Sequence, residues 1–173
     1  MKMLVALCTL CLLAPAVRAQ AEEGGSGQEV MVVDWDAQGT NMRDAPSGKV
    51  VHVIPFQGKK HVRMVAIQGQ SKGWFNVVFE GRKGWMHGSV LGTCASATED
   101  GDPALCKNPD NSSPATETIP SGAPVTLLDM HEDWLKVRYT DSKGKKHEGW
   151  LPQQSLMLSE GMQQECVSAW AKK

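Results

Sequence analysis

A repeated tryptophan-containing segment constrains the fold of this chain more than any other feature. Residues 73–79 (GWFNVVF) match residues 133–139 (DWLKVRY), and residues 84–91 (GWMHGSVL) match residues 149–156 (GWLPQQSL). In the first pair of segments the apolar residues alternate, which is the period of a half-buried β-strand. Turn-forming residues lie between the paired segments of each copy. The repeat therefore predicts two copies of one small β-domain.

The copies also align upstream, at an offset of 64 residues that places Met42 opposite Cys106 and Gly58 opposite Gly122. Strand-forming stretches follow at residues 62–66 and 125–128. Each copy thus supplies about five short strands, and the 17 glycines and 9 prolines of the chain suit many tight corners. We predict an all-β fold of two tandem, strongly bent small β-barrels that adjoin near residues 92–93, followed by a short C-terminal α-helix.

Several segments of the first copy resemble a bacterial SH3 (SH3b) domain: residues 41–47 (NMRDAPS), 49–51, 73–77 and 84–89. The second copy keeps 106–109 (CKNP) and 149–152 (GWLP), so the resemblance extends over about residues 29–158. It implies SH3-like barrels, a place at the cell envelope, and cell-wall peptide (peptidoglycan or muropeptide) as the ligand.

The chain departs from the SH3 pattern near the end of each copy. SH3 domains usually carry a tyrosine just before the final apolar residue of this segment, whereas this chain has Val90 and Ser155. Aromatic side chains build the groove that holds a proline-rich helix. We therefore do not expect recognition of proline-rich peptides.

The first residues read as a secretory signal. Lys2 precedes an apolar run over residues 4–13, and small residues at 17–19 suit cleavage near Ala19. Ten apolar residues are too few to span a bilayer, so we expect an exported, periplasmic or secreted protein with no membrane anchor. The predicted organisation is 1–19 signal peptide, 20–28 flexible leader, 29–92 first barrel, 93–158 second barrel and 159–173 C-terminal helix and tail.

The C-terminal helix is expected to begin after Ser159, which would be its N-cap. Met162, Cys166, Val167 and Trp170 fall on one face of such a helix. We expect this apolar face to pack on a barrel or in the groove between the two barrels.

Three cysteines follow the predicted signal peptide: Cys94, Cys106 and Cys166. Export favours one disulfide among them. In the repeat alignment Cys94 faces Val30 and Cys106 faces Met42, on the first two paired segments of the second barrel. A Cys94–Cys106 bond would contribute roughly 2–3 kcal/mol by closing a short loop. We predict this pair, with Cys166 as a buried thiol; the alternatives pair Cys166 with Cys94 or with Cys106.

The tryptophans are the candidate ligand-binding residues. Trp74 and Trp134 each begin a strand after a loop, a position that flanks the peptide groove of SH3-like barrels; the alternative for each is a partly buried core residue. Trp35 lies in the first loop and has no counterpart in the second copy. The remaining candidates are Asp44 and Asn108, in the loops expected to border the site.

Two further tryptophans, Trp85 and Trp150, follow the glycines of the second repeated segment. We assign them mainly to packing.

Catalytic and metal chemistry find little support in the sequence. No histidine follows Cys166 in the sequence, so no Cys-His pair of a catalytic dyad is evident there. No two histidines have metal-ligand spacing on one element. We therefore expect neither an enzyme nor a metal or other cofactor. The net charge of −1 gives no reason to expect nucleic acid as a partner.

The sequence thus favours a non-catalytic binding module whose partner is cell-wall peptide or an envelope protein. The alternative is a periplasmic protein–protein adaptor or an accessory subunit of a separately encoded wall hydrolase. The oligomeric state is left open.

Overall fold

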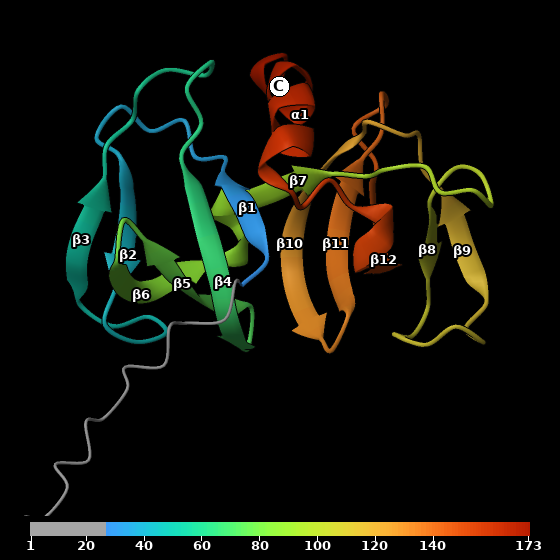
Figure 1. Cartoon of the computed structure of the whole chain (residues 1–173), viewed down its shortest axis with the longest axis horizontal. Helices are drawn as coiled ribbons and strands as arrows, with labels where there is room; N and C mark the ends of the chain where they lie inside the picture. Colours follow the sequence, from blue (N-terminus) through green and yellow to red (C-terminus); the bar gives the residue numbers. More distant parts are fainter. Residues whose placement is uncertain (1–26) are drawn as a thin grey trace, which may run out of the picture.

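The computed structural model describes residues 27–173; the predicted signal peptide and most of the predicted leader lie outside them. The chain is mostly β-structure with one short C-terminal α-helix, which confirms the all-β class (Figure 1). The elements are β1 (Glu29–Val32), β2 (Thr40–Arg43), β3 (Val50–Ile54), β4 (Met64–Ser71), β5 (Trp74–Phe79), β6 (Arg82–His87), η1 (Gly88–Val90), β7 (Leu91–Cys94), β8 (Ala104–Cys106), β9 (Ala115–Thr118), β10 (Pro124–His131), β11 (Trp134–Thr140), β12 (Lys146–Pro152), η2 (Gln153–Ser155) and α1 (Glu160–Ala171).

The strands form one sheet in the order β3-β2-β6-β5-β4-β1-β7-β10-β11-β12-β8-β9, rather than two sheets that each close separately. The join is the antiparallel pairing of β1 with β7, in which Met31 lies opposite Gly92. Each of these strands also pairs within its own half, β1 with β4 and β7 with β10. The predicted junction near residues 92–93 is therefore a strand shared by both halves of the sheet.

The two halves of the sheet have the same strand order. Read from its outer edge inward, the first half runs β3-β2-β6-β5-β4-β1 and the second β9-β8-β12-β11-β10-β7. Both halves carry a register shift at the same place, between Ile67 and Gly69 in β4 and between Leu127 and Asp129 in β10. Each half has six strands rather than about five, because short edge strands (β3 and β9) pair with β2 and β8.

The glycine of each repeated Gly-Trp pair lets two strands approach closely. A Cβ atom on Gly84 would lie 2.9 Å from Met42 Cε, and one on Gly149 would lie 2.7 Å from Leu105 Cβ. Gly84 and Gly149 are equivalent in the repeat, so the motif allows β2 and β8 to pack over β6 and β12 at this point. The recurring glycine is thus explained by packing.

One apolar core extends through both halves. The inward-facing residues of the central strands, among them Phe75, Val77, Leu135 and Val137, are fully buried in the same cluster. Their neighbours along β5 and β11 are only half-buried. This alternation is the one that the repeated segments predicted.

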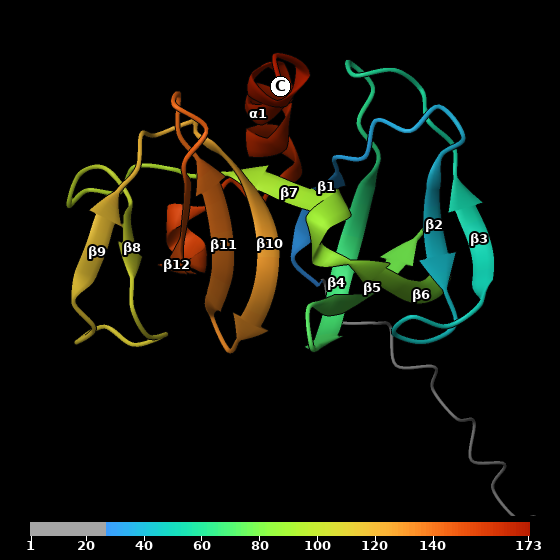
Figure 2. The ribbon, with the colours of Figure 1, turned by 180° about the vertical axis from the view of Figure 1, so that it is seen from behind.

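Helix α1 packs against β1 and β7, over the join between the halves (Figures 1 and 2). The helix and the outer face of these strands form a second apolar cluster around Met31, Cys94, Cys166 and Trp170. Of the two placements predicted for the helix, on one barrel or between the two, the structure has it over the join between the halves. Its first residue follows Ser159 as predicted, although the Ser159 side chain makes no capping hydrogen bond.

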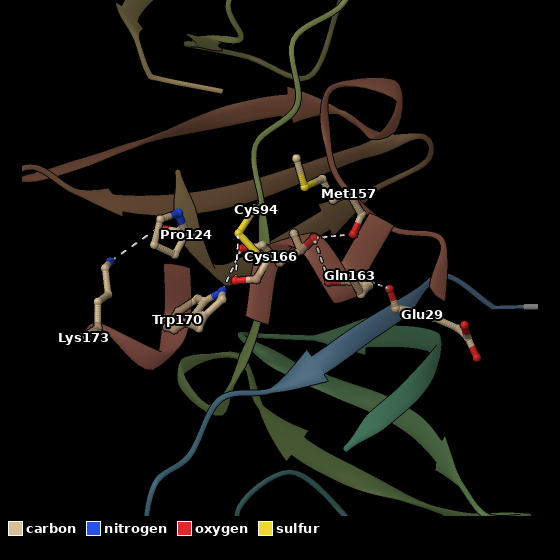
Figure 3. The surroundings of a disulfide bond; sticks show 9 residues. Glu29, Cys94, Pro124, Met157, Gln163, Cys166, Trp170 and Lys173 are labelled. Atoms are coloured by element: carbon tan, nitrogen blue, oxygen red, sulfur yellow. Dashed lines mark hydrogen bonds between the residues drawn. A yellow bond between two sulfur atoms is a disulfide. The ribbon is translucent and has the colours of Figure 1, made fainter. Parts of the chain in front are cut away.

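Polar contacts inside this second cluster hold α1 in place (Figure 3). The indole Nε1–H of Trp170 donates to the carbonyl of Thr93 at 3.0 Å, and the Gln163 amide donates to the carbonyl of Glu29 at 3.0 Å. The Thr93 hydroxyl donates to the Met157 carbonyl at 2.7 Å. Because buried polar groups are costly unless they are paired, these bonds favour one position of the helix.

The disulfide joins Cys94 to Cys166, so the predicted Cys94–Cys106 pair is wrong (Figure 3). Cys106 is a free, half-buried thiol on β8. Three strands, β10, β11 and β12, lie between β7 and β8 in the sheet, so Cys94 and Cys106 are not on neighbouring strands. The bond instead ties the C-terminal helix to the strand at the join, as one of the alternatives proposed.

A one-residue slip in the upstream alignment caused this error. Cys106 lies opposite Trp150 just as Arg43 lies opposite Trp85, which gives an offset of 63 residues rather than 64. Since neighbouring residues of a strand face opposite sides of a sheet, a slip of one reverses every side chain. By the same offset Cys94 corresponds to Met31, which faces α1, and not to Val30, which faces the main core.

Candidate functional site

The two tryptophans that begin β5 and β11 lie at the same end of the molecule. The turns that precede them, between β4 and β5 and between β10 and β11, are both at the end opposite α1 (Figure 1). The two hairpins touch, because the Gln70 amide donates to the carbonyl of Met130 at 3.3 Å. The repeat thus places Trp74 and Trp134 on adjacent hairpins.

Trp134 lies in a hollow of about 390 Å³. The indole is half-buried on the side of β11 that faces away from the core, and Pro152 of β12 lies opposite it in the sheet. The full lining of the hollow is Asn111, Asp133, Trp134, Pro152, Gln153 and Gln154. An aromatic face beside several amides and one carboxylate is the composition of a small polar binding site.

Some of these polar groups are already used by the fold. The Gln153 side chain accepts a hydrogen bond from the Gln28 amide and donates to the carbonyl of Glu132 at 3.4 Å. The side chains of Asn111 and Gln154 make no hydrogen bond to any residue of the 27–173 segment. Asn111 and Gln154 are therefore the groups free to bind a ligand in this hollow.

Trp74 has a different neighbour. His87 takes the place that Pro152 has in the second half, and the two rings meet edge to face with centroids 5.3 Å apart. The His87 Nδ1 lies 2.8 Å from the Ser89 hydroxyl, which orients the imidazole. The equivalent tryptophans thus present different surfaces, a Trp–His pair in the first half and a tryptophan beside proline and amides in the second.

The bordering loops contribute other residues than those predicted. The Asp44 carboxylate accepts a hydrogen bond from the Lys49 amide at 2.8 Å, which closes its own turn. Asn108 is exposed, and its backbone N–H donates to the Ser113 hydroxyl at 2.8 Å. Within this second loop it is Asn111 that lines the hollow beside Trp134.

Trp35 does not join the other candidates. It follows β1, at the end of the first half where α1 lies, whereas Trp74 begins β5 at the opposite end (Figure 1). Its ring packs edge to face on Phe56 with centroids 6.4 Å apart, and Lys59 Nζ lies 5.6 Å from the ring centre. The structure therefore separates Trp35 from the Trp134 hollow.

Trp85 and Trp150 are half-buried and belong to neither apolar cluster. They face outward from β6 and β12, where Trp85 lies opposite Arg43 and Trp150 opposite Cys106. They are therefore not part of the apolar core, and their assignment mainly to packing stays a prediction. They add aromatic surface to the outer face of β6 and β12, which pair with the strands that carry Trp74 and Trp134.

The structure pairs one histidine with carboxylates. His147 lies 3.1 Å from an Asp141 oxygen and 3.4 Å from a Glu117 oxygen. The hydrogen bond from His147 lowers the pKa of Asp141, and backbone N–H groups of Lys145 and Lys143 lower it further. No group of three or more potential ligands within residues 27–173 is arranged to hold a metal ion. This cluster braces the β11–β12 turn.

Residues 107–157 match the family model described as Bacterial SH3 domain, so the chain contains one such domain there. The matched segment includes every residue that lines the Trp134 hollow. No curated protein matches the chain.

Two solved structures from Trichomonas vaginalis are similar to this chain at 13% identity each. NlpC1 matches with a TM-score of 0.33 over 86% of this chain and 51% of its own, and NlpC2 with 0.31 over 79% and 49%. The chain therefore spans about half the length of these proteins. No helix within residues 27–173 is both long and apolar enough to cross a bilayer.

Proposed function

We propose that the protein is a non-catalytic module of the cell envelope that binds cell-wall peptide in the Trp134 hollow. The observation that carries this proposal is the placement of the hollow inside the bacterial SH3 domain at residues 107–157. The resemblance of the chain to such domains implied cell-wall peptide as the ligand. The hollow is open to solvent and is lined by groups that suit a peptide.

The chemistry of the lining suggests how a peptide would be held. The indole of Trp134 offers a flat apolar face at little cost in side-chain entropy. The free amides of Asn111 and Gln154 can donate to peptide carbonyls and accept from peptide N–H groups. The Asp133 carboxylate makes no ion pair with any residue between 27 and 173 and can attract an ammonium group of the peptide.

We also propose that the first half is a second, diverged SH3-like barrel, and that the protein is exported. The identical strand order of the halves and the matching register shifts support a duplicated barrel. In this arrangement Trp74 supplies a second site. It should be the weaker one, because His87 already contacts the Trp74 ring.

Binding to purified peptidoglycan sacculi tests the proposal. We expect the protein without residues 1–19 to sediment with sacculi at moderate salt. Trp134→Ala should reduce the bound fraction by roughly tenfold, because loss of a central aromatic anchor costs 1–2 kcal/mol or more. Trp74→Ala should reduce it less.

The matched control is Phe56→Ala, which removes an exposed aromatic side chain at the opposite end of the first half and should leave binding unchanged. Circular dichroism of each variant checks that it is folded. No retention of the wild-type protein by sacculi, or equal retention of the wild type and Trp134→Ala, would contradict the proposal.

An adaptor role through the apolar face of α1 has less support. Such a role would need Val167 and Trp170 exposed, but Trp170 is 5% exposed and Val167 is half-buried in the second cluster. Only Met162 of that face is exposed. The face is used to hold the helix on the sheet.

A further inference from the structure

A groove runs along α1, at the end of the molecule opposite the Trp134 hollow. It consists of two adjoining hollows of about 470 and about 430 Å³, which share Lys60, Gln164 and Val167 in their linings. The helix forms one wall, and residues 55–63, between β3 and β4, form the other (Figure 1). Because the hollows share residues, they form one elongated site rather than two.

The second half does not reproduce the two walls of this groove. The segment of the second half that corresponds to residues 55–63 is the shorter segment 119–123. Helix α1 follows the last repeated strand and has no counterpart in the first half. The longer segment 55–63 and helix α1 thus meet to form this groove, and the second half has no equivalent groove of this kind because its segment 119–123 is shorter.

The groove carries an excess of positive charge. Lys60 and Lys172 are exposed in its lining, and within residues 27–173 neither side chain has an ion-pair or hydrogen-bond partner. Arg63 pairs with Glu80, so the one carboxylate in the lining is already neutralised. His61 lines the groove as well. Asp34 lines the small hollow beside Trp35 and not this groove.

The remaining lining is apolar or carries amides. Val62, Met64 and Val167 are half-buried along the walls, and the exposed side chains of Gln57 and Gln164 also line the groove. At one end the groove adjoins the Trp35–Phe56 pair, through shared lining residues such as Val62. A ligand of this site must therefore be elongated, negatively charged and partly apolar.

We propose that this groove binds an acidic peptide, an extended segment of a partner protein in which carboxylate and apolar side chains alternate. The carboxylates would pair with Lys60 and Lys172, the apolar side chains would contact Val62 and Val167, and the free glutamine amides would bond the peptide backbone. A small anion would leave the apolar walls and most of the groove unused. The complementarity of charge and shape therefore favours a peptide.

The test uses a fluorescein-labelled nonapeptide, Gly-Glu-Leu-Glu-Gly-Glu-Leu-Glu-Gly, and a copy with every Glu replaced by Gln. Binding is followed by fluorescence anisotropy at low and moderate salt. We expect saturable binding of the acidic peptide that weakens as salt rises, and binding of the Gln copy weaker by roughly tenfold. The double variant Lys60→Glu/Lys172→Glu should weaken acidic-peptide binding by at least about tenfold.

The matched control is Lys143→Glu/Lys145→Glu, which changes the net charge by the same amount at the β11–β12 turn. It should leave peptide binding within about twofold, since long-range attraction is screened at moderate salt. Thermal unfolding checks that both double variants are folded. Equal weakening by both double variants, no effect of Lys60→Glu/Lys172→Glu, or no saturable binding of the acidic peptide would overturn the proposal.

Two more outcomes also decide against it. Trigalacturonate, an acidic oligosaccharide, serves as a competitor. Stronger binding of this oligosaccharide than of the peptide would assign the groove to an anionic glycan instead. Loss of peptide binding in Trp134→Ala would place the peptide in the other site. Sacculi should retain the Lys60→Glu/Lys172→Glu variant as they retain the wild type, whether or not the groove binds the peptide. A negative result in the peptide assay therefore leaves the proposed wall-binding function standing.

Discussion

Removal of the Cys94–Cys166 disulfide is expected to lower the free energy of unfolding by about 4 kcal/mol. The two cysteines are 72 residues apart, and a cross-link over a loop of this length restricts the unfolded chain strongly. Both sulfur-bearing residues are buried, so the bond also holds α1 against β7 in the folded state. The double variant Cys94→Ala/Cys166→Ala should therefore unfold at a clearly lower urea concentration than the oxidised wild type.

Cys106→Ser is the control for this measurement, because Cys106 is free and only half-buried. It should unfold near the wild-type midpoint in oxidising buffer and should lose stability, like the wild type, when a reductant is added. An unfolding midpoint of Cys94→Ala/Cys166→Ala equal to that of the oxidised wild type would contradict the assigned role of the disulfide. A larger loss of stability in Cys106→Ser than in Cys94→Ala/Cys166→Ala would also contradict it.

Trp170→Ala is expected to lower the free energy of unfolding by about 3–5 kcal/mol, the usual cost of removing a large buried aromatic side chain. Trp170 is 5% exposed, and its ring lies directly over Gly92, where an added Cβ would meet ring atom Cζ2 at 2.5 Å. The substitution also leaves the Thr93 carbonyl without its indole donor. Both effects remove contacts between α1 and the join of the two halves.

Trp170→Phe separates the two effects, since it keeps most of the ring and loses the hydrogen bond. It should cost less than Trp170→Ala, and Met162→Ala, an exposed position of the same helix, should cost less than about 0.5 kcal/mol. Urea unfolding followed by circular dichroism measures all three. Similar stabilities for Trp170→Ala and Met162→Ala would show that the helix is not packed as described.

The sequence predicted the central strands well because two independent signals agreed there. Alternation at Phe75, Val77, Leu135 and Val137 marked the buried face, and the repeated tryptophan segments set the register. The segments before them, around Met42 and Cys106, show less regular alternation and no repeated tryptophan. The two copies were therefore aligned there with an offset of 64 residues, whereas the structure has 63. That slip was small in sequence but reversed the faces assigned to Cys94 and Cys106, and with them the disulfide.

The candidate site was predicted in part, for a similar reason. Trp134 was marked by the repeat, whereas Asn111 and Gln154 lie where the two copies differ and could not be found by comparing them. The residues of the groove along α1 are harder still to predict from the sequence, because their proximity depends on where the helix packs on the sheet. The Cys94–Cys166 bond and the packing of Trp170 place the helix residues Gln164 and Val167 beside Lys60, and no local pattern in the sequence encodes that contact.

Titration of the ¹⁵N-labelled protein with a soluble disaccharide-tetrapeptide muropeptide tests wall-peptide binding at the Trp134 hollow most directly. The account predicts saturable shifts of the Trp134 indole N–H and of the Asn111 and Gln154 side-chain amides, with much smaller shifts at the Trp35 indole. It also predicts that Trp134→Ala abolishes the shifts at Asn111 and Gln154. No shift at these three residues, or shifts confined to the α1 groove, would contradict it.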